Sequence, residues 1–346
     1  MIFLIPSLFS CLMACNSDNK SNAEEKTDIT NEVGDEDTSD DSANEEDDSS
    51  AFETVPEDHI ELGQGLIIAF ESIPAGTFLM GSPISEEGRV GNEDLHDVTL
   101  TRDFLVSTSE ITQGMYFQLM GYQVHDGYSA DCGEGTDYPA YYVSWHMAAD
   151  FSNKLTQKYN SLYERNLQEC YSCSASATPS VTCSTAIQPI YDCSGYRMLT
   201  EAEWEYSARS GTTQAFWTSN GGGDLPIEST STTSILSDGF DLTTVAWYYP
   251  TVGTPYGAKE VANLLPNHYG LYDMIGNLGE WTHDAYQENL GMDPVIDPVW
   301  EMASARVLRN DGWSGYPDDI RSARRRSKDP YERSAIIGFR IGKTIH

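Results

Sequence analysis

Residues His268–Asp284 read HYGLYDMIGNLGEWTHD, with aromatics and glycines too closely spaced for a helix. Two carboxylates, Asp273 and Glu280, flank Gly276 and Gly279, which can adopt positive φ and fold the backbone back on itself. Carboxylates and turn carbonyls are the hard oxygen ligands that Ca²⁺ prefers. On the residues alone, a polar turn with a solvated Asp and Glu is the stronger interpretation, because no standard calcium-loop spacing is met.

The core of this stretch, GLYDMIGNLGEW, resembles the signature loop of the formylglycine-generating enzyme (sulfatase-modifying factor) family. In that family the loop binds calcium. Carried over by position, Asp273 and Glu280 would supply side-chain oxygens, and Gly276 and Leu278 main-chain carbonyls. Gly279 replaces the more usual Trp, which removes packing area but no ligand. The resemblance therefore implies structural calcium at Asp273, Gly276, Leu278 and Glu280.

Other segments resemble the same family in the same order along the chain. Ile73–Ser82 is similar to its opening motif, and Arg306–Pro317 to its C-terminal strands, with Asn310–Trp313 where Gly-Gly-Ser-Trp is commoner. The resemblance spans roughly Ile73 to Ile341. It implies one irregular α+β domain related to C-type lectins, with few helices, many loops and little regular secondary structure, over residues 63–346.

The N-terminus predicts an exported lipoprotein. Met1–Ala14 is apolar, and the tetrapeptide Leu12–Cys15 resembles a bacterial lipoprotein box, which implies cleavage before Cys15 and lipidation of its thiol. Fourteen residues are too few to span a bilayer as a helix but suit a signal peptide, although the basic n-region is missing. The alternative is an ordinary buried segment. We expect a signal peptide over 1–14 and a lipid-anchored protein of the bacterial cell envelope, periplasmic or surface-facing.

An acidic tether is expected over residues 15–62. Before Gln64 the chain has 18 Asp and Glu against two Lys, and few large apolar residues follow Cys15. Such a segment cannot bury enough surface to offset its ordering entropy, so we expect disorder. The whole chain has a formal charge of −34, which repels phosphate backbones and argues against nucleic-acid binding.

Five cysteines remain in the expected domain, and four of them fall in an insert over residues 166–194. They are candidates for disulfides: Cys132, Cys170, Cys173, Cys183 and Cys193. A C-x-x-C followed by two more cysteines also suits a zinc knuckle or a redox pair. An exported protein favours a disulfide-stapled insert, although four cysteines allow three pairings that sequence cannot separate. Cys132 is then left over, unless it pairs into the insert.

Local signals predict three helices. Thr112 precedes one that ends near Gly121, and Ser144 is a good N-cap for a second. Thr200 and Glu203 form a capping box for a third. Its carboxylates Glu201 and Glu205 are expected on the helix surface, solvated or paired with a neighbour such as Arg209, without a catalytic role.

The C-terminal part is locally basic: from Arg306 onward there are ten Lys and Arg against five Asp and Glu. One interpretation is internal pairing, with Arg321 and Arg325 anchored to buried carboxylates. The other is a basic and aromatic patch that binds an acidic partner, and the resemblance implies a segment that some relatives vary for ligand display. The candidate contact residues are Trp313, Tyr316, Asp318, Arg324, Arg326 and Tyr331.

The family's oxidases convert a substrate cysteine to formylglycine with two C-terminal cysteines that hold copper, and soft thiolates are what Cu(I) requires. The matching segment here, Ser314–Arg325, has none, and no cysteine follows Cys193. We therefore expect no copper and predict a non-catalytic binding module for an unknown protein or glycan of the envelope. The alternative is a sulfatase-modifying oxidase that converts a protein cysteine to formylglycine, which the missing cysteine pair disfavours.

Overall fold

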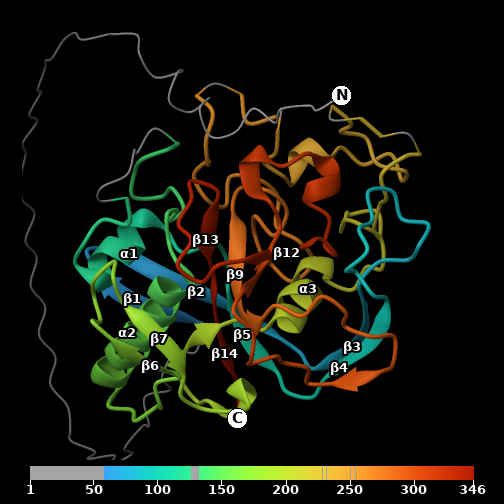
Figure 1. Cartoon of the computed structure of the whole chain (residues 1–346). Coiled ribbons are helices and arrows are strands. Elements are labelled where there is room, and N and C mark those ends of the chain that lie inside the picture. The colour runs from blue at the N-terminus through green and yellow to red at the C-terminus, as the bar shows by residue number, and fades with distance from the viewer. Residues whose placement is uncertain (1–57, 126–131, 228, 231, 250, 254) are drawn as a thin grey trace, which may run out of the picture.

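The computed structural model describes residues 58–125, 132–227, 229–230, 232–249, 251–253 and 255–346 (Figure 1). The expected signal peptide, the lipidation site Cys15 and nearly all of the acidic tether lie outside the described residues. Strand β1 (His59–Gly63) begins ahead of the expected domain boundary at residue 63. Its side chains Ile60 and Leu62 alternate into the core, so the folded part starts at the end of the expected tether.

Two larger sheets organise the domain. The five-stranded sheet has the order β1-β2-β5-β14-β8, and its further strands are β2 (Leu66–Ile73), β5 (Phe104–Ser107), β14 (Ile341–Thr344) and β8 (Arg197–Met198). The four-stranded sheet has the order β12-β11-β9-β13, formed by β12 (Arg325–Lys328), β11 (Arg306–Arg309), β9 (Gly279–Ala285) and β13 (Ile337–Phe339). The last two strands of the chain thus enter different sheets, which ties the C-terminus to both.

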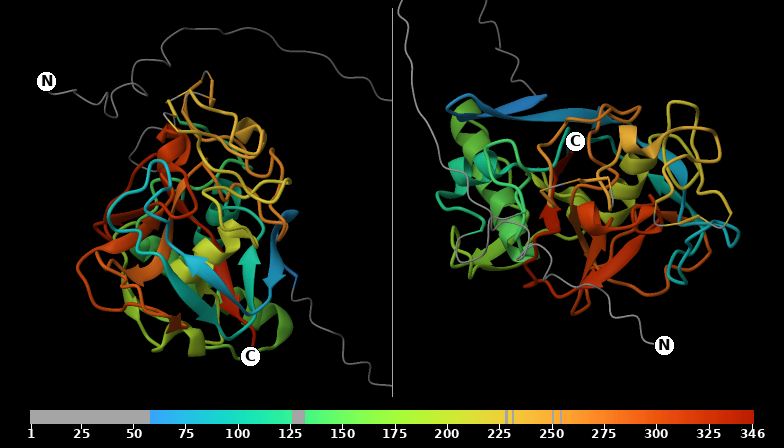
Figure 2. Two further views of the ribbon diagram at one scale, coloured as in Figure 1. Left: turned by 90° about the vertical axis from the view of Figure 1, so that its right-hand side faces the viewer. Right: turned by 90° about the horizontal axis from the view of Figure 1, so that it is seen from above.

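Two smaller sheets lie at the sides of the domain. The three-stranded sheet β10-β4-β3 contains β10 (Val295–Ile296), β4 (His96–Leu100) and β3 (Gly76–Met80). The two-stranded hairpin contains β6 (Tyr171–Ser174) and β7 (Thr182–Thr185). Figures 1 and 2 place this hairpin with α1 and α2 at one side of the domain, and α3 with β3 and β4 at the other.

Within the described residues, three α-helices begin at the N-caps that the sequence predicted. They are α1 (Gln113–Met120), α2 (Trp145–Tyr163) and α3 (Glu201–Arg209). The Oγ atoms of Thr112 and Ser144 accept the expected backbone N–H bonds, and Gly121 closes α1 in the left-handed conformation. The capping box of Thr200 and Glu203 is complete. Four short 3₁₀ turns complete the elements: η1 (Ile190–Asp192), η2 (Leu242–Thr244), η3 (Gly312–Ser314) and η4 (Pro317–Asp319). None of the helices in the described part combines the length and apolar character needed to span a bilayer.

Two buried tryptophans join α2 to the central strand β9. Trp145 Nε1 donates to the carbonyl of Thr282 at 2.9 Å, and Trp281 Nε1 donates to the carbonyl of Val143 at 2.8 Å. Both indoles are almost completely buried. Each buries a large apolar surface with its polar atom satisfied, so this reciprocal pair fixes the signature loop and strand β9 against the main core.

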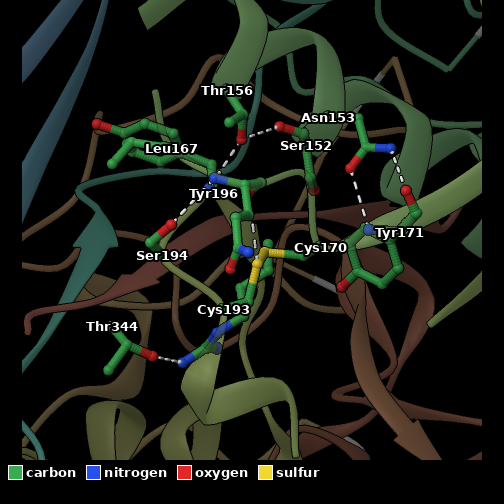
Figure 3. Close-up of a disulfide and its surroundings, with 12 residues drawn as sticks. Ser152, Asn153, Thr156, Leu167, Cys170, Tyr171, Cys193, Ser194, Tyr196 and Thr344 are labelled. Atoms are coloured by element: carbon green, nitrogen blue, oxygen red, sulfur yellow. Dashed lines mark hydrogen bonds between the residues drawn. A yellow bond between two sulfur atoms is a disulfide. The ribbon is translucent and has the colours of Figure 1, made fainter. Parts of the chain in front are cut away.

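The insert is held by two disulfides, Cys170–Cys193 and Cys173–Cys183, which selects one of the three possible pairings. All four of its sulfurs are therefore used, and neither a zinc knuckle nor a free thiol pair remains there. Figure 3 shows Cys170–Cys193 beside Asn153 of α2, whose amide hydrogen-bonds the backbone of Tyr171 in both directions. Cys132 is buried near Ala258 and Leu278, away from the insert's cluster.

Candidate ligand-binding face

The signature loop is a tight turn that enters strand β9. Asp273 and Asn277 have positive φ values of 55° and 52°, and Gly276 has 81°. A Cβ at Gly276 would collide with the carbonyl of Trp247, so the close approach of these two segments requires glycine. The turn is buried rather than solvated, because both Asp273 and Glu280 are enclosed by the domain.

An arginine binds Glu280. Arg340 Nε and Nη2 each donate to one carboxylate oxygen at 2.7 Å, and Trp204 Nε1 donates to Oε2 at 2.7 Å. Glu280 and Arg340 are both almost completely buried. This is the bidentate geometry in which guanidinium and carboxylate pair most strongly, so both oxygens of Glu280 have hydrogen-bond partners.

Two further carboxylates lie beside this pair. Glu110 accepts from Leu278 N at 2.9 Å and from Asn277 Nδ2 at 2.6 Å. Asp273 Oδ2 accepts from Ala262 N at 2.7 Å, while Oδ1 is buried without a partner. Burial raises the pKa of Asp273 to about 6, and burial followed by the charges of Asp273 and Glu280 raises the pKa of Glu110 well above its usual value. Three buried acids thus share one arginine.

At two of the four residues expected to bind calcium, the ligand atoms already have protein partners. Arg340 binds Glu280, and the carbonyl of Gly276 accepts from Asn310 Nδ2 at 3.1 Å. Across the described ranges, no group of three or more His, Cys, Asp or Glu is arranged to hold a metal ion. An ion at this loop would compete with Arg340 for Glu280. Calcium binding stays a prediction, and a chelation measurement decides between the ion and the arginine.

Internal pairing accounts for the fully buried arginines. Arg321 binds Glu86 and Glu93 at 2.5–2.9 Å, and Arg325 binds both oxygens of Glu201 at 2.5 and 2.8 Å. The expectation for Arg321 and Arg325 is therefore confirmed. Burial alone would raise the pKa of Glu201, but Arg325 and Arg309 outweigh it and hold that pKa below its usual value.

From the sequence we expected the carboxylates of helix α3 at the protein surface. The structure contradicts this expectation. Glu201 and Glu205 are buried, and Glu205 binds Arg209 at 2.7 Å and Arg309 at 2.7 Å. The pairing of Glu205 with Arg209 was predicted, whereas its burial was not. These carboxylates can be buried because Arg309 of β11, which is distant in sequence, supplies the hydrogen bonds and positive charge that water would otherwise provide.

Three of the expected contact residues meet at one acidic side chain. Asp319 Oδ1 accepts from Arg324 Nη2 at 3.1 Å and from Arg326 Nη2 at 3.2 Å, and Tyr316 N lies 3.4 Å from Oδ2. Arg326 also contacts Asp311. Burial raises the pKa of Asp311 to about 6, although Arg326 opposes this shift. We call Tyr316, Asp319, Arg324 and Arg326 the C-terminal face.

An aromatic group extends this face. The Tyr316 ring packs edge-on against Tyr249, with 5.3 Å between centroids, and Tyr249 stacks on Tyr256 at 6.2 Å. Tyr316 and Tyr249 are 39% and 37% exposed, enough to offer ring surface to a ligand. Neither Tyr249 nor Asp319 was predicted from the sequence. The second is adjacent to the expected Asp318, but which of two neighbouring aspartates faces the arginines depends on the turn η4.

The other expected contact residues lie apart from this group. Trp313 is half-buried, and its Nε1 donates to the carbonyl of Ala335 at 3.1 Å, so it serves packing. Asp318 is exposed, and its backbone carbonyl accepts from Arg321. Tyr331 is 58% exposed but packs on His146 of α2, with 4.4 Å between ring centroids. The structure therefore brings together Tyr316, Arg324 and Arg326 and leaves Tyr331 over the hairpin side.

A pocket of about 360 Å³ lies along the edge strand β12, next to the C-terminal face. Its lining comes from three distant segments, and only one of its residues, Val90, is aliphatic. The lining residues are Val90, Asn92, Tyr286, Arg324, Arg325, Arg326, Ser327 and Lys328. Asn92 and Tyr286 gave no local signal in the sequence, because only the fold brings them to β12.

Comparison with known proteins places this geometry in a family. The chain is 31% identical over 166 residues to the serine/threonine-protein kinase pkn1 of Chlamydia pneumoniae, covering 45% of this chain and 23% of the kinase. It is 31% identical over 159 residues to the formylglycine-generating enzyme of Streptomyces coelicolor, covering 42% and 46%. The chain thus spans less than half the length of these two relatives.

The fold is shared with solved structures. Treponema denticola variable protein 1 superposes with a TM-score of 0.63 at 26% identity, over 83% of this chain and 98% of that one. Residues 64–345 match the sulfatase-modifying factor enzyme 1-like (FGE-sulfatase) domain, which is nearly the whole described part. The irregular α+β fold and the order of motifs agree with that match, and the chain belongs to the FGE-sulfatase family.

Proposed function

We propose that this protein is a non-catalytic binding module of the bacterial cell envelope, anchored by a lipid at Cys15, with its ligand site at the C-terminal face. The anchor rests on the lipoprotein-type sequence before Cys15. The ligand is a protein or glycan of the envelope. Calcium is not needed for this proposal, because Arg340 already neutralises part of the charge around the signature loop.

One observation carries the proposal. The segment that matches the family's copper-binding cysteines contains Tyr316, Asp319 and Arg324 instead of thiols, and no cysteine follows Cys193. The four cysteines of the insert are paired as disulfides, so they offer no thiolate for Cu(I). Residues 314–325 therefore supply no thiolate that could hold copper for the oxidation of a substrate cysteine.

The geometry of the face supports binding. Tyr316 and Tyr249 expose ring surface, while Arg324 and Arg326 are held in fixed orientations by Asp319. Aromatic rings beside oriented polar groups are common in recognition sites, because they lose little conformational freedom on binding. The domain also occurs in relatives named as a kinase and as formylglycine-generating enzymes, which supports the view that it serves several activities.

The test is retention of envelope components by the immobilised full chain. The variant pair Tyr249→Ala with Tyr316→Ala removes the exposed rings. Phe117→Ala removes an aromatic ring of similar exposure, 46%, on helix α1 and serves as the control. We expect a component retained by the wild type and by Phe117→Ala but lost from the tyrosine variant. Equal retention by all three would reject this face as the binding site.

A further inference from the structure

Strand β12 is an outer strand of the four-stranded sheet. It pairs antiparallel with β11 on one side, and no described strand pairs with it on the other. In an antiparallel ladder only alternate residues direct their N–H and C=O groups to the partner strand, so the remaining residues of β12 direct theirs to the free side. No backbone hydrogen bond from elsewhere in the described chain meets them there. Such an edge is a template for one more strand.

The pocket described above lies along this free edge. Its lining includes every residue of β12, together with the preceding Arg324, and no residue of β11. Ser327, in the middle of this stretch, is exposed. The free side of β12 is therefore open to an extended chain over the full length of the strand.

The two faces of β12 differ in chemistry. Arg325 is buried, binds Glu201 of α3, and places its guanidinium 5.2 Å from the centre of the Tyr286 ring. Because successive side chains of a strand point to opposite faces, Arg326 and Lys328 share the other face, where their side chains are 39% and 29% exposed. A strand added here meets an aromatic ring on one face and two cations on the other.

The charge along the edge is positive. Four of the lining residues are Lys or Arg, and none is Asp or Glu. Arg326 and Lys328 pair with Asp319 and Glu332, but partly exposed ion pairs contribute little free energy, so carboxylates of a ligand can share these cations. The same charges oppose pairing of β12 with the β12 of a second copy, because like charges on neighbouring strands repel. The edge therefore selects an acidic strand.

We infer that the free edge of β12 binds an extended acidic segment of a partner protein, which joins the sheet as a further strand. In this arrangement alternate side chains of the segment are acidic and face Arg326 and Lys328. The side chains between them are β-branched and face Tyr286. Backbone hydrogen bonds supply the affinity in this mode of binding, and alternate side chains supply the specificity. The inference rests on the proposed function and specifies the class of its partner.

The test is fluorescence anisotropy on the full chain with a labelled hexapeptide of alternating glutamate and valine. Two analogues are N-methylated, one at the glutamates and the other at the valines, so each loses the N–H groups along one edge of the peptide. We expect one analogue to bind about tenfold more weakly and the other to keep its affinity, since only one set of N–H groups faces β12. A peptide of alternating lysine and valine should not bind.

A pair of protein variants tests the charged face. Lys328→Gln should weaken the acidic peptide about threefold, the usual size of a partly exposed charge contact. Lys154→Gln, on α2 and outside the pocket lining, removes a charge of the same sign and should leave the affinity unchanged. Unchanged melting temperatures show that both variants remain folded.

The inference is wrong if the acidic peptide does not bind, if the two N-methylated analogues behave alike, or if Lys328→Gln binds the peptide as the wild type does. Loss of an envelope component from the Tyr249 and Tyr316 variant, without any peptide binding, would leave the proposed function standing and remove only the strand-edge inference. Carbodiimide cross-links from Lys328 to residues 15–57 of the same chain, in place of peptide binding, would assign the edge to the chain's own acidic segment and likewise overturn it.

Discussion

Arg340 and Glu280 form a buried, bidentate ion pair, with both hydrogen bonds 2.7 Å long, inside the loop where the sequence resemblance implied calcium. The pair joins the residue directly before strand β14 to the start of strand β9, which lies sixty residues earlier in the chain. Trp204 of α3 adds a third bond to the same carboxylate. One carboxylate, Glu280, thus connects the signature loop, helix α3 and Arg340 next to the C-terminal strand, and its removal should be costly.

Breaking this pair should destabilise the whole domain. Glu280→Gln leaves the Arg340 charge buried without its bidentate partner, and such changes cost about 3–5 kcal/mol. Lys328 and Glu332 form a comparable but partly exposed pair, so Glu332→Gln should cost less than about 1 kcal/mol. The measurement is urea denaturation of both variants. Similar midpoints for the two would show that Glu280 is not held as described.

Chelation distinguishes Arg340 from calcium as the cation of the loop. Because Arg340 already occupies both oxygens of Glu280, we expect EDTA to leave the melting temperature unchanged. Calcium would stabilise the folded state if it bound there, since a ligand of the native state shifts unfolding by mass action. A lower melting temperature in EDTA, restored by added calcium and absent from Glu280→Gln, would establish the ion.

Asp273 should make stability depend on pH. Its folded pKa is raised from 3.8 to about 6, so the folded state binds more protons than the unfolded state between those values. Stability then falls as pH rises through this window, and the loss is complete above pH 6. Asp273→Asn should remove this contribution, while Asp311 and Asp284, whose pKa values are also raised, keep theirs. It should raise stability at pH 7 by up to about 3 kcal/mol, since no buried charge remains at this position and asparagine tolerates the positive φ.

The control for this measurement is Asp318→Asn, because this substitution neutralises a carboxylate that is exposed to solvent. Melting temperatures of wild type and both variants are compared from pH 4 to pH 7. The same pH dependence of the melting temperature in wild type and Asp273→Asn would contradict the assignment.

The disulfide pairing can be read directly by peptide mapping under non-reducing conditions. The expected cross-linked pairs are Cys170 with Cys193 and Cys173 with Cys183. Replacing Cys170 and Cys193 together by serine should cost about 2–5 kcal/mol, the usual effect of losing a native disulfide. Any other pairing within the insert would show that β6 and β7 are joined differently.

Local features of the fold were predictable from the sequence. The caps at Ser144 and Thr200 depend on residues three positions apart, so short-range chemistry determines them. The family and its α+β architecture followed from motifs that keep their order. The disulfide pairing did not follow, because it depends on how the insert folds over α2.

Long-range pairings decided what sequence could not. The sequence around Glu201 predicts a surface carboxylate, but in the structure it is buried against Arg325, which lies 124 residues later in the chain. Tyr331 is close in sequence to Arg326 yet packs on His146, because strand β12 leads the chain away from the C-terminal face. Asn92 and Tyr286 reach the pocket by the same kind of tertiary contact, which no local pattern reveals.

The most direct test of the central claim is a mass-spectrometric assay for aldehyde formation. The purified chain, supplied with copper and oxygen, is incubated with a cysteine peptide that the Streptomyces coelicolor formylglycine-generating enzyme converts. With no cysteine at the C-terminal face, the chain should leave every peptide thiol unchanged. Formation of formylglycine by this chain would contradict its assignment as a binding module without catalysis.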